Sequence, residues 1–180
     1  MVAVRKDQVV QGRPFKWPAA LSTRRLPLDR RKPDDDARRL PPKDLQRGLP
    51  RFHVKKSIRK FMAKGVDPRK TTVFTDVFAT GTFHASMNGV MPCLTRERAK
   101  KGGFWVSTRG RLTTTDEMFR FQGLDPAAIK FESLGISVTE IRGMLGNAMT
   151  VNVCGRVLRE LIVCAGLVRR LPADPWAEDV

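Results

Sequence analysis

The chain has few of the residues that build metal centres or disulfide-stabilised folds. Its 180 residues include three cysteines and two histidines, and neither histidine lies near a cysteine in the sequence. An odd number of cysteines without metal-like spacing argues against a disulfide framework and against a metal site. We interpret Cys154 and Cys164 as core residues of a helix, and we expect a reducing compartment.

Long apolar runs are also missing. No stretch approaches the roughly 18 apolar residues of a membrane-spanning helix, and the N-terminus lacks the hydrophobic core of a signal peptide. We therefore expect no membrane partner. The expected location is intracellular, and nuclear if the organism is eukaryotic.

Acidic residues are scarce in the N-terminal part. Residues 1–70 hold 21 of the 34 Lys and Arg residues but 7 of the 18 Asp and Glu residues, so they carry +14 of the net charge of +16. Such an asymmetry indicates a polyanion partner, with nucleic acid as the leading candidate. The alternative is a solvated basic arm without a specific partner. Prolines and charge runs predict that residues 1–50 are largely disordered.

Residues 54–64 have the pattern of a basic amphipathic helix. Membrane-surface helices and calmodulin-binding helices share this pattern. We favour an ordinary surface helix, because the segment is a single helix among globular neighbours. Strands are predicted over residues 71–80 and 104–107, the second of them preceded by Gly102-Gly103.

Two sequence blocks between residues 111 and 153 are the most informative feature of the chain. The first reads Arg111-Leu112-Thr113-Thr114-Thr115-Asp116-Glu117, followed by Gln122-Gly123 and Asp125-Pro126. The second reads Gly146-Asn147-Ala148-Met149-Thr150-Val151-Asn152-Val153.

The first block predicts a helix over residues 114–122. Thr114 followed by Glu117 forms a capping box, and acidic side chains suit the positive end of a helix. The helix would end at Gly123, because glycine readily adopts the left-handed conformation of a helix terminus. Its expected core residues are Met118 and either Phe121 or Leu124.

Two further helices are predicted towards the C-terminus. Ser137 and Glu140 form a second capping box, which predicts a helix over residues 138–145 that ends before Gly146. Apolar residues then recur at helical spacing over residues 150–168. That apolar face needs a partner surface, since each fully buried large aliphatic side chain contributes ~1.5–3 kcal/mol. One hypothesis is that this face joins a partner protein.

In their order and spacing, the two blocks resemble the last two conserved motifs of the DNA (cytosine-5) methyltransferases. Two ordinary capped helices would explain the capping boxes. They would not explain why Gln122-Gly123 and Gly146-Asn147-Ala148 occur together downstream of Arg-Leu-Thr. The resemblance covers about residues 72–168. It implies that the chain is the C-terminal part of an enzyme that transfers a methyl group from S-adenosylmethionine to C5 of cytosine in DNA.

The catalytic motifs of that family are missing from this chain. The family uses a glycine-rich cofactor turn, a Pro-Cys nucleophile and a Glu-Asn-Val segment, and the chain has neither a Gly-x-Gly turn after a strand nor Glu-Asn-Val. Pro92-Cys93 imitates the nucleophile, but Leu94 follows it in place of the family's glutamine. Cys93 also lies only 18 residues before Arg111. We therefore predict no catalytic residue here, and we expect a catalytic half from a longer chain or a second polypeptide.

The segment before Arg111 occupies the place of the family's target-recognition region. In the family, loops on a small β-rich domain enter the major groove of DNA at this point. The resemblance implies that four basic residues face the duplex, where arginine can bind guanine or phosphate. These residues are Arg96, Arg98, Lys100 and Lys101. The alternative for each is a solvated charged turn.

The second block implies a contact with the cofactor. In the family, a Gly-Asn-Ala or Gly-Asn-Ser turn lines the S-adenosylmethionine pocket, which carries over to Asn147 and Ala148. Backbone N–H groups that precede a helix suit a carboxylate or hydroxyl group. Met149-Thr150 departs from the small or branched apolar residues usual there. The alternative is a plain connector between two helices.

The sequence as a whole predicts an α+β chain. We expect a basic segment over 1–50, a target-recognition-like region over 51–110, methyltransferase motifs over 111–168 and a tail over 169–180. The resemblance implies the C-terminal helices of a partial S-adenosylmethionine-dependent, Rossmann-like methyltransferase, joined to a small β-rich recognition region. Residues 111–123 would form the scaffold helix that ties the two together. The competing hypothesis is a non-catalytic basic DNA-binding module.

Overall fold

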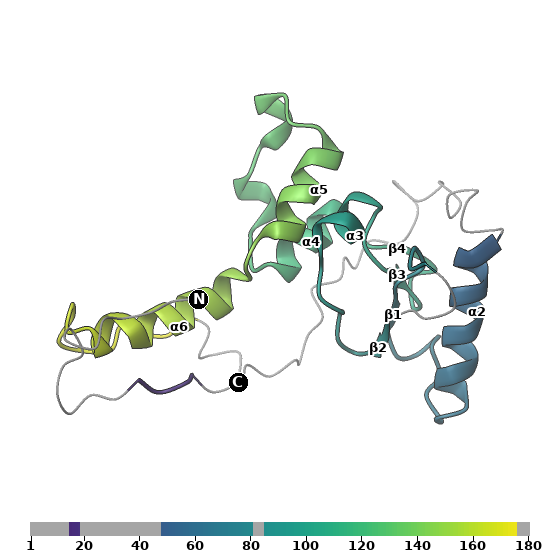
Figure 1. Cartoon of the computed structure of the whole chain (residues 1–180), viewed down its shortest axis with the longest axis horizontal. Helices are drawn as coiled ribbons and strands as arrows, with labels where there is room; N and C mark the ends of the chain where they lie inside the picture. The colour runs from purple at the N-terminus through teal and green to yellow at the C-terminus, as the bar shows by residue number, and fades with distance from the viewer. Residues whose placement is uncertain (1–14, 19–47, 81–84, 176–180) are drawn as a thin grey trace. The chain divides into compact units, whose positions relative to one another are not determined.

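A four-stranded antiparallel sheet organises the larger of two units in this computed structural model (Figure 1). The structure describes residues 15–18, 48–80 and 85–175. The strand order is β2-β1-β3-β4. The strands are β1 (Val73–Thr75), β2 (Ser86–Asn88), β3 (Trp105–Val106) and β4 (Arg111–Leu112). Helices combined with this sheet confirm the α+β class. Most of the predicted disordered segment, residues 1–50, lies outside the described residues.

The strands are shorter than the sequence predicts. The central strand β1 is fully buried, and its residue Phe74 pairs with Met87 on one side and Val106 on the other. β1 ends before Asp76, because the Asp76 carboxylate accepts a hydrogen bond from the backbone N–H of Phe78 (3.2 Å) and turns the chain. The edge strands β2 and β4 were not predicted, since neither segment has an alternating apolar pattern.

The chain enters β3 through Gly102-Gly103, whose φ angles are 104° and 77°. Thr113, the residue that follows β4, stabilises this turn. Its hydroxyl donates to the carbonyl of Gly102 (3.1 Å) and accepts from the N–H of Phe104 (3.3 Å). A Cβ atom on Gly103 would overlap the Thr113 hydroxyl. Glycine is therefore required at this position, both for its positive φ and for the space.

Helix α2 (Gly48–Met62) lies beside the sheet and begins six residues before the predicted start at residue 54 (Figure 1). Pro50 lies in its first turn, where the missing N–H of proline is tolerated. The first turn lacks the acidic residues that usually mark the start of a helix in a sequence, which explains why the predicted start was too late.

Two buried polar contacts join α2 to β1 and to the turn that follows it. His53 Nδ1 donates to the carbonyl oxygen of Val77 at 3.2 Å, and the Thr75 hydroxyl donates to the Ser57 hydroxyl at 2.7 Å. Both His53 and Ser57 are fully buried. The two hydrogen bonds pair polar groups that would otherwise be buried without a partner, and they attach the inner face of α2 to the sheet.

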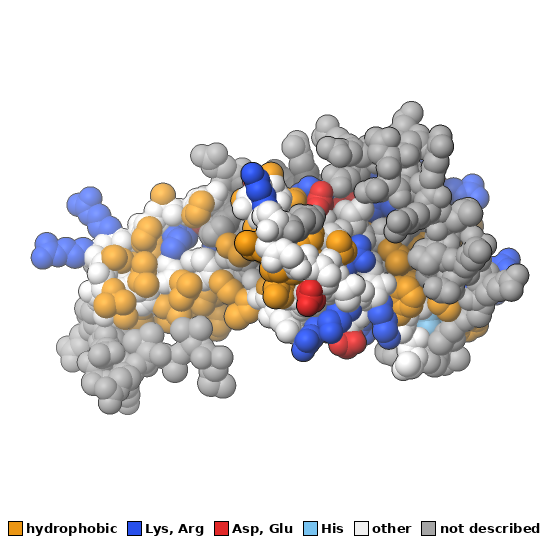
Figure 2. All heavy atoms as spheres, turned by 90° about the horizontal axis from the view of Figure 1, so that it is seen from above, with side chains coloured by type: hydrophobic (Ala, Val, Ile, Leu, Met, Phe, Trp, Pro, Cys, Tyr) orange, Lys and Arg blue, Asp and Glu red, His pale blue; other side chains and the backbone are white. Residues whose placement is uncertain are grey.

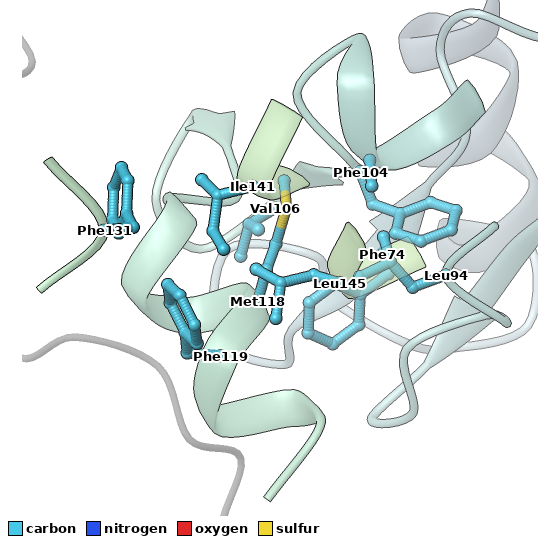
Figure 3. Close-up of a cluster of buried hydrophobic side chains, with 10 residues drawn as sticks. Phe74, Leu94, Phe104, Val106, Met118, Phe119, Phe131, Ile141 and Leu145 are labelled. Carbon is cyan, nitrogen blue, oxygen red and sulfur yellow. The ribbon is translucent and has the colours of Figure 1, made fainter. Parts of the chain in front are cut away.

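A cluster of buried apolar side chains on the other face of the sheet forms the main core (Figure 3). The elements that join the sheet in this core are α3 (Arg96–Lys100), α4 (Thr115–Phe121), the 3-10 turn η3 (Phe131–Leu134) and α5 (Val138–Asn147). Met118 is fully buried, as predicted, whereas Phe121 is only partly buried. Phe119 is also buried, and its ring stacks on Phe131 with 6.1 Å between the centroids. Neither of these two rings was among the expected core residues.

Both predicted capping boxes are confirmed. The N–H of Glu117 donates to the Thr114 hydroxyl (3.1 Å), and the Thr114 N–H donates to the Glu117 carboxylate (2.8 Å). Ser137 and Glu140 form the same reciprocal pair at the start of α5, with distances of 2.9 and 3.2 Å. Gly123 follows α4 with a φ of 72°, the left-handed terminus predicted from the sequence.

The second unit contains α6 (Val151–Cys164), which ends four residues before the predicted end at residue 168. Gly166, with a φ of 71°, follows the last turn. Figure 2 shows hydrophobic side chains spread along α6. Several of them are exposed, including Val151, Val153 and Leu158.

Segments of the second unit lie against the polar side of α6. The Asp174 carboxylate accepts hydrogen bonds from Arg156 (2.8 Å) and lies 3.2 Å from a guanidinium nitrogen of Arg159. Both cysteines lie in α6, but only Cys164 is buried and is confirmed as a core residue, whereas Cys154 is only partly buried. No helix among the described residues is long and apolar enough to span a membrane.

Candidate functional site

The second motif block begins inside α5, and not after it as the sequence predicts. α5 continues through Gly146 and ends at Asn147. A Cβ atom on Gly146 would lie 2.6 Å from the backbone of Thr95 and Arg96. Gly146 therefore acts as a packing residue: the absence of a side chain lets α5 lie directly against the backbone at the start of α3. The prediction of a helix end before Gly146 was wrong because the glycine was interpreted as a terminator.

A hydrogen bond at the same place joins the first motif block to Leu145, the residue just before the second block. The buried side chain of Gln122, just after α4, donates from Nε2 to the carbonyl oxygen of Leu145 at 2.8 Å. The Ala148 N–H donates to the same carbonyl at 3.2 Å. The first block thus binds the last turn of α5, where the second block begins. We call this contact between α3, α4 and the end of α5 the motif junction.

The four basic residues expected to contact DNA lie on and beside α3, in different surroundings. Arg96 and Lys101 are exposed. The Arg98 side chain is 38% exposed and forms an ion pair with the buried carboxylate of Asp76, at 2.5 Å. The aliphatic part of Lys100 packs on Gly143 of α5. Arg96 and Lys101 are therefore available to a ligand, whereas Arg98 and Lys100 also stabilise the fold.

The cofactor residues predicted from the sequence lie next to this basic group. Asn147 and Ala148 are both exposed, and Asn147 follows the Gly146 that rests on the Arg96 backbone. The structure therefore brings the predicted DNA-contact segment and the predicted cofactor turn together. The Ala148 N–H is already bonded to Leu145, so a ligand at this turn would be bound by the Asn147 amide.

A buried ion pair supports the start of the first motif block. Both terminal nitrogens of Arg111 donate to the Glu117 carboxylate at 2.9 Å, in the bidentate geometry typical of strong pairs. Glu117 is fully buried and Arg111 is 16% exposed. The same carboxylate closes the capping box of α4. The pair therefore fixes β4 to the helix that follows it.

Two residues of this region were missed from the sequence. Asp76 anchors Arg98 from the end of β1, and the only sequence signal is an acidic residue just after an apolar strand. Arg142 of α5 donates from Nε to the Thr115 hydroxyl at 3.0 Å, which links α5 to the start of α4. Burial lowers the pKa of Arg142 below its ordinary value.

The cysteine that imitates a nucleophile lies at the surface. Cys93 is exposed on the loop before α3. No three His, Cys, Asp or Glu side chains gather as metal ligands in the part of the chain that the structure describes.

No protein-family model, no curated protein and no solved structure matches this chain.

Proposed function

We propose that this chain supplies the target-recognition region and the last two motifs of a DNA (cytosine-5) methyltransferase. In this proposal it contacts DNA through the basic residues of α3 and the cofactor S-adenosylmethionine through Asn147 and Ala148. The nucleophile, the glycine-rich cofactor turn and the Glu-Asn-Val segment come from a catalytic half, supplied by a longer chain or by a second polypeptide.

The observation that supports this proposal best is the hydrogen bond from Gln122 to the carbonyl of Leu145. It joins the first sequence block to Leu145, the residue just before the second block and two residues before the exposed Asn147. Two unrelated capped helices would not need a buried amide to meet at this position. The adjacent Arg96 supplies positive charge beside the proposed cofactor turn.

The proposal assigns different roles to the motif residues. Arg111, Glu117 and Gln122 position the junction, because each is engaged in contacts inside the protein. Asn147 is the residue placed to bind a ligand, because its side chain is exposed at the end of a fixed helix. The apolar face of α6 would pack against the catalytic half, which would cover exposed side chains such as Leu158.

A chimeric enzyme tests the cofactor role. Residues 111–168 would replace the last two motifs of a cytosine-5 methyltransferase, and binding of S-adenosylmethionine and methyl transfer to duplex DNA would be measured. We expect the chimera to retain both activities. Asn147→Ala should weaken cofactor binding by about 10-fold, since a lost hydrogen bond to a charged group costs ~1.5 kcal/mol. Asn152→Ala, which removes an amide from the same block, is the matched control.

The result that would refute the proposal is a folded chimera that does not bind S-adenosylmethionine while the parent enzyme does. A second experiment uses the full chain alone, which should transfer no methyl group. If the full chain methylated DNA and Cys93→Ser abolished the activity, this division of labour between two halves would be wrong.

The alternative is a DNA-binding module without any enzymatic role. The exposed basic residues of α2 and the following loop favour it. The chimera tests this alternative, because residues 111–168 of a pure binding module would supply no cofactor affinity.

A further inference from the structure

Helix α2 presents an exposed face that carries only positive charge. Arg51, Lys55 and Arg59 form one row at i, i+4 spacing, and Lys56 and Lys60 form the row beside it. All five side chains are exposed, and the helix contains no acidic residue. We call this surface the cationic face of α2. Three more exposed basic residues follow within eight positions of the helix end: Lys64, Arg69 and Lys70.

The clustering of these charges costs stability. Like charges at i, i+4 on a helix destabilise it by ~0.2–0.5 kcal/mol for each pair. Arg51 with Lys55, Lys55 with Arg59, and Lys56 with Lys60 are three such pairs. Among the described residues, no acidic side chain forms an ion pair with Arg51, Lys55 or Arg59 that would relieve this repulsion. An external polyanion would relieve it.

We propose that the cationic face of α2 is a docking surface for the phosphate backbone of double-stranded DNA. The inference rests on the proposed function for its choice of nucleic acid, and it places a backbone contact outside the two motif blocks. Arg59 lies eight residues after Arg51 in the same row, which is about 12 Å at ~1.5 Å per residue. That length is comparable with the ~12 Å width of the major groove, so the two ends of the face can reach phosphates on both of its sides.

The way α2 is anchored favours DNA over a membrane or a calmodulin-like partner. Both alternatives need the apolar side of an amphipathic helix to be available. Here that side is occupied: Phe61 is 6% exposed, and His53 and Ser57 are bonded to the sheet. What remains accessible is the charged side, where the exposed Phe52 begins the row of Lys56 and Lys60 and the Lys56 Nζ lies 5.7 Å from the centre of the Phe52 ring.

The face is suited to contacts that do not depend on DNA sequence. It contains no asparagine or glutamine, the side chains that bind adenine edges. It is also held on a rigid element, because Lys60 donates to the Ser86 hydroxyl of β2 at 3.1 Å in addition to the buried contacts of α2. Phosphate contacts from such a face would orient the protein on the duplex and leave sequence recognition to other segments.

Charge-neutral variants of the full chain test the proposal. Binding to a fluorescent 20-base-pair duplex would be measured by anisotropy at several salt concentrations, without S-adenosylmethionine. Loss of two phosphate contacts in Lys55→Gln with Arg59→Gln should reduce the slope of log affinity against log salt by about 1.8, at ~0.9 per contact. The same relation corresponds to about 30-fold weaker binding at 0.15 M salt. The double variant should be at least as stable as the natural chain, because it removes like-charge pairs.

The matched control is Lys130→Gln with Arg170→Gln, which removes one lysine and one arginine from exposed positions outside α2. The control should leave the slope within experimental error of the natural chain, and the charge-preserving Lys55→Arg with Arg59→Lys should do the same. Equal slopes for the α2 variant and the control would overturn the proposal. So would binding to phosphatidylserine vesicles, but not to DNA, that depends on Lys55 and Arg59. The chimera of residues 111–168 lacks α2, so its result is independent of this one.

Discussion

Replacing Gly146 by alanine tests the geometry of the motif junction directly. The substitution adds one methyl group to the last turn of α5. In the structure that methyl group would lie 2.6 Å from the Arg96 Cα, the Arg96 N and the Thr95 C atoms. These are backbone atoms, so no side-chain rotation can relieve the overlap. An ordinary contact begins at 3.4 Å, so α3 and α5 would have to separate by about 0.8 Å.

Two opposing effects decide how much Gly146→Ala changes the free energy of unfolding. Alanine is favoured over glycine within a helix by ~1 kcal/mol at most, and by less near a helix end. Overpacking a close-packed contact costs ~1–3 kcal/mol, and a rigid backbone neighbour places this site at the upper end. We therefore expect Gly146→Ala to lower the free energy of unfolding by about 2 kcal/mol.

Gly143→Ala is the matched control on the same helix. Its added methyl group would meet Lys100 Cε at 3.0 Å, and this atom is near the end of a flexible side chain that can move away. Gly143→Ala should therefore be neutral or should stabilise the protein by up to ~1 kcal/mol through helix propensity. Urea denaturation of both full-length variants measures the difference. If Gly146→Ala were as stable as Gly143→Ala, α5 would not rest directly on the α3 backbone.

Three other predictions concern the contacts around the junction. Glu117→Gln should lower the free energy of unfolding by ~3 kcal/mol, because it leaves Arg111 inside the protein without its charged partner; a loss below ~1 kcal/mol in urea denaturation would contradict a buried pair. Gln122→Glu should destabilise more than Gln122→Met at neutral pH, since a carboxylate would face a carbonyl oxygen, and its excess cost should vanish on acidification in the same assay. Hydrogen bonds from Ser137 lower the pKa of Glu140 below its ordinary value of 4.5, so this contribution to stability is complete above that value and is lost as the pH falls through the lower pKa of the folded protein. Ser137→Ala should return the NMR-monitored pKa of Glu140 towards 4.5, and an unchanged titration would refute the assignment.

Signals that act within a few residues were predictable from the sequence. The two capping boxes depend on side chains three residues from the backbone groups that they satisfy, and the terminus at Gly123 depends on the ability of glycine to adopt a positive φ. The Gly102-Gly103 turn before β3 belongs to the same class. In each case the signal lies in residues close together in the chain, so it can be recognised without knowledge of a distant partner.

Features that depend on distant partners were not predictable. Gly146 has the sequence signature of a helix end, yet it lies within α5. Glycine occurs there because the backbone of Thr95 and Arg96 lies against it and leaves no room for a side chain. The five-residue helix α3 was not expected, since it buries only Ala99 and its N-cap, Thr95, makes no side-chain hydrogen bond. β2 likewise depends on its pairing with β1, because its residues are exposed or only partly buried and have no strand pattern of their own.

The motif residues differ in whether a substitution can provide evidence about function, because some are required by the fold and others are not. Arg111, Glu117 and Gln122 are each required by the fold, so a ligand is not needed to explain why these residue types occur where they do. Substituting them would lower stability whether or not the protein binds a cofactor, and a loss of activity in such variants would be ambiguous. Asn147 is different, because it is exposed and follows the glycine that packs on α3. A variant at Asn147 that keeps its stability and loses cofactor binding would therefore be evidence for a ligand, which no variant of the three buried residues can supply.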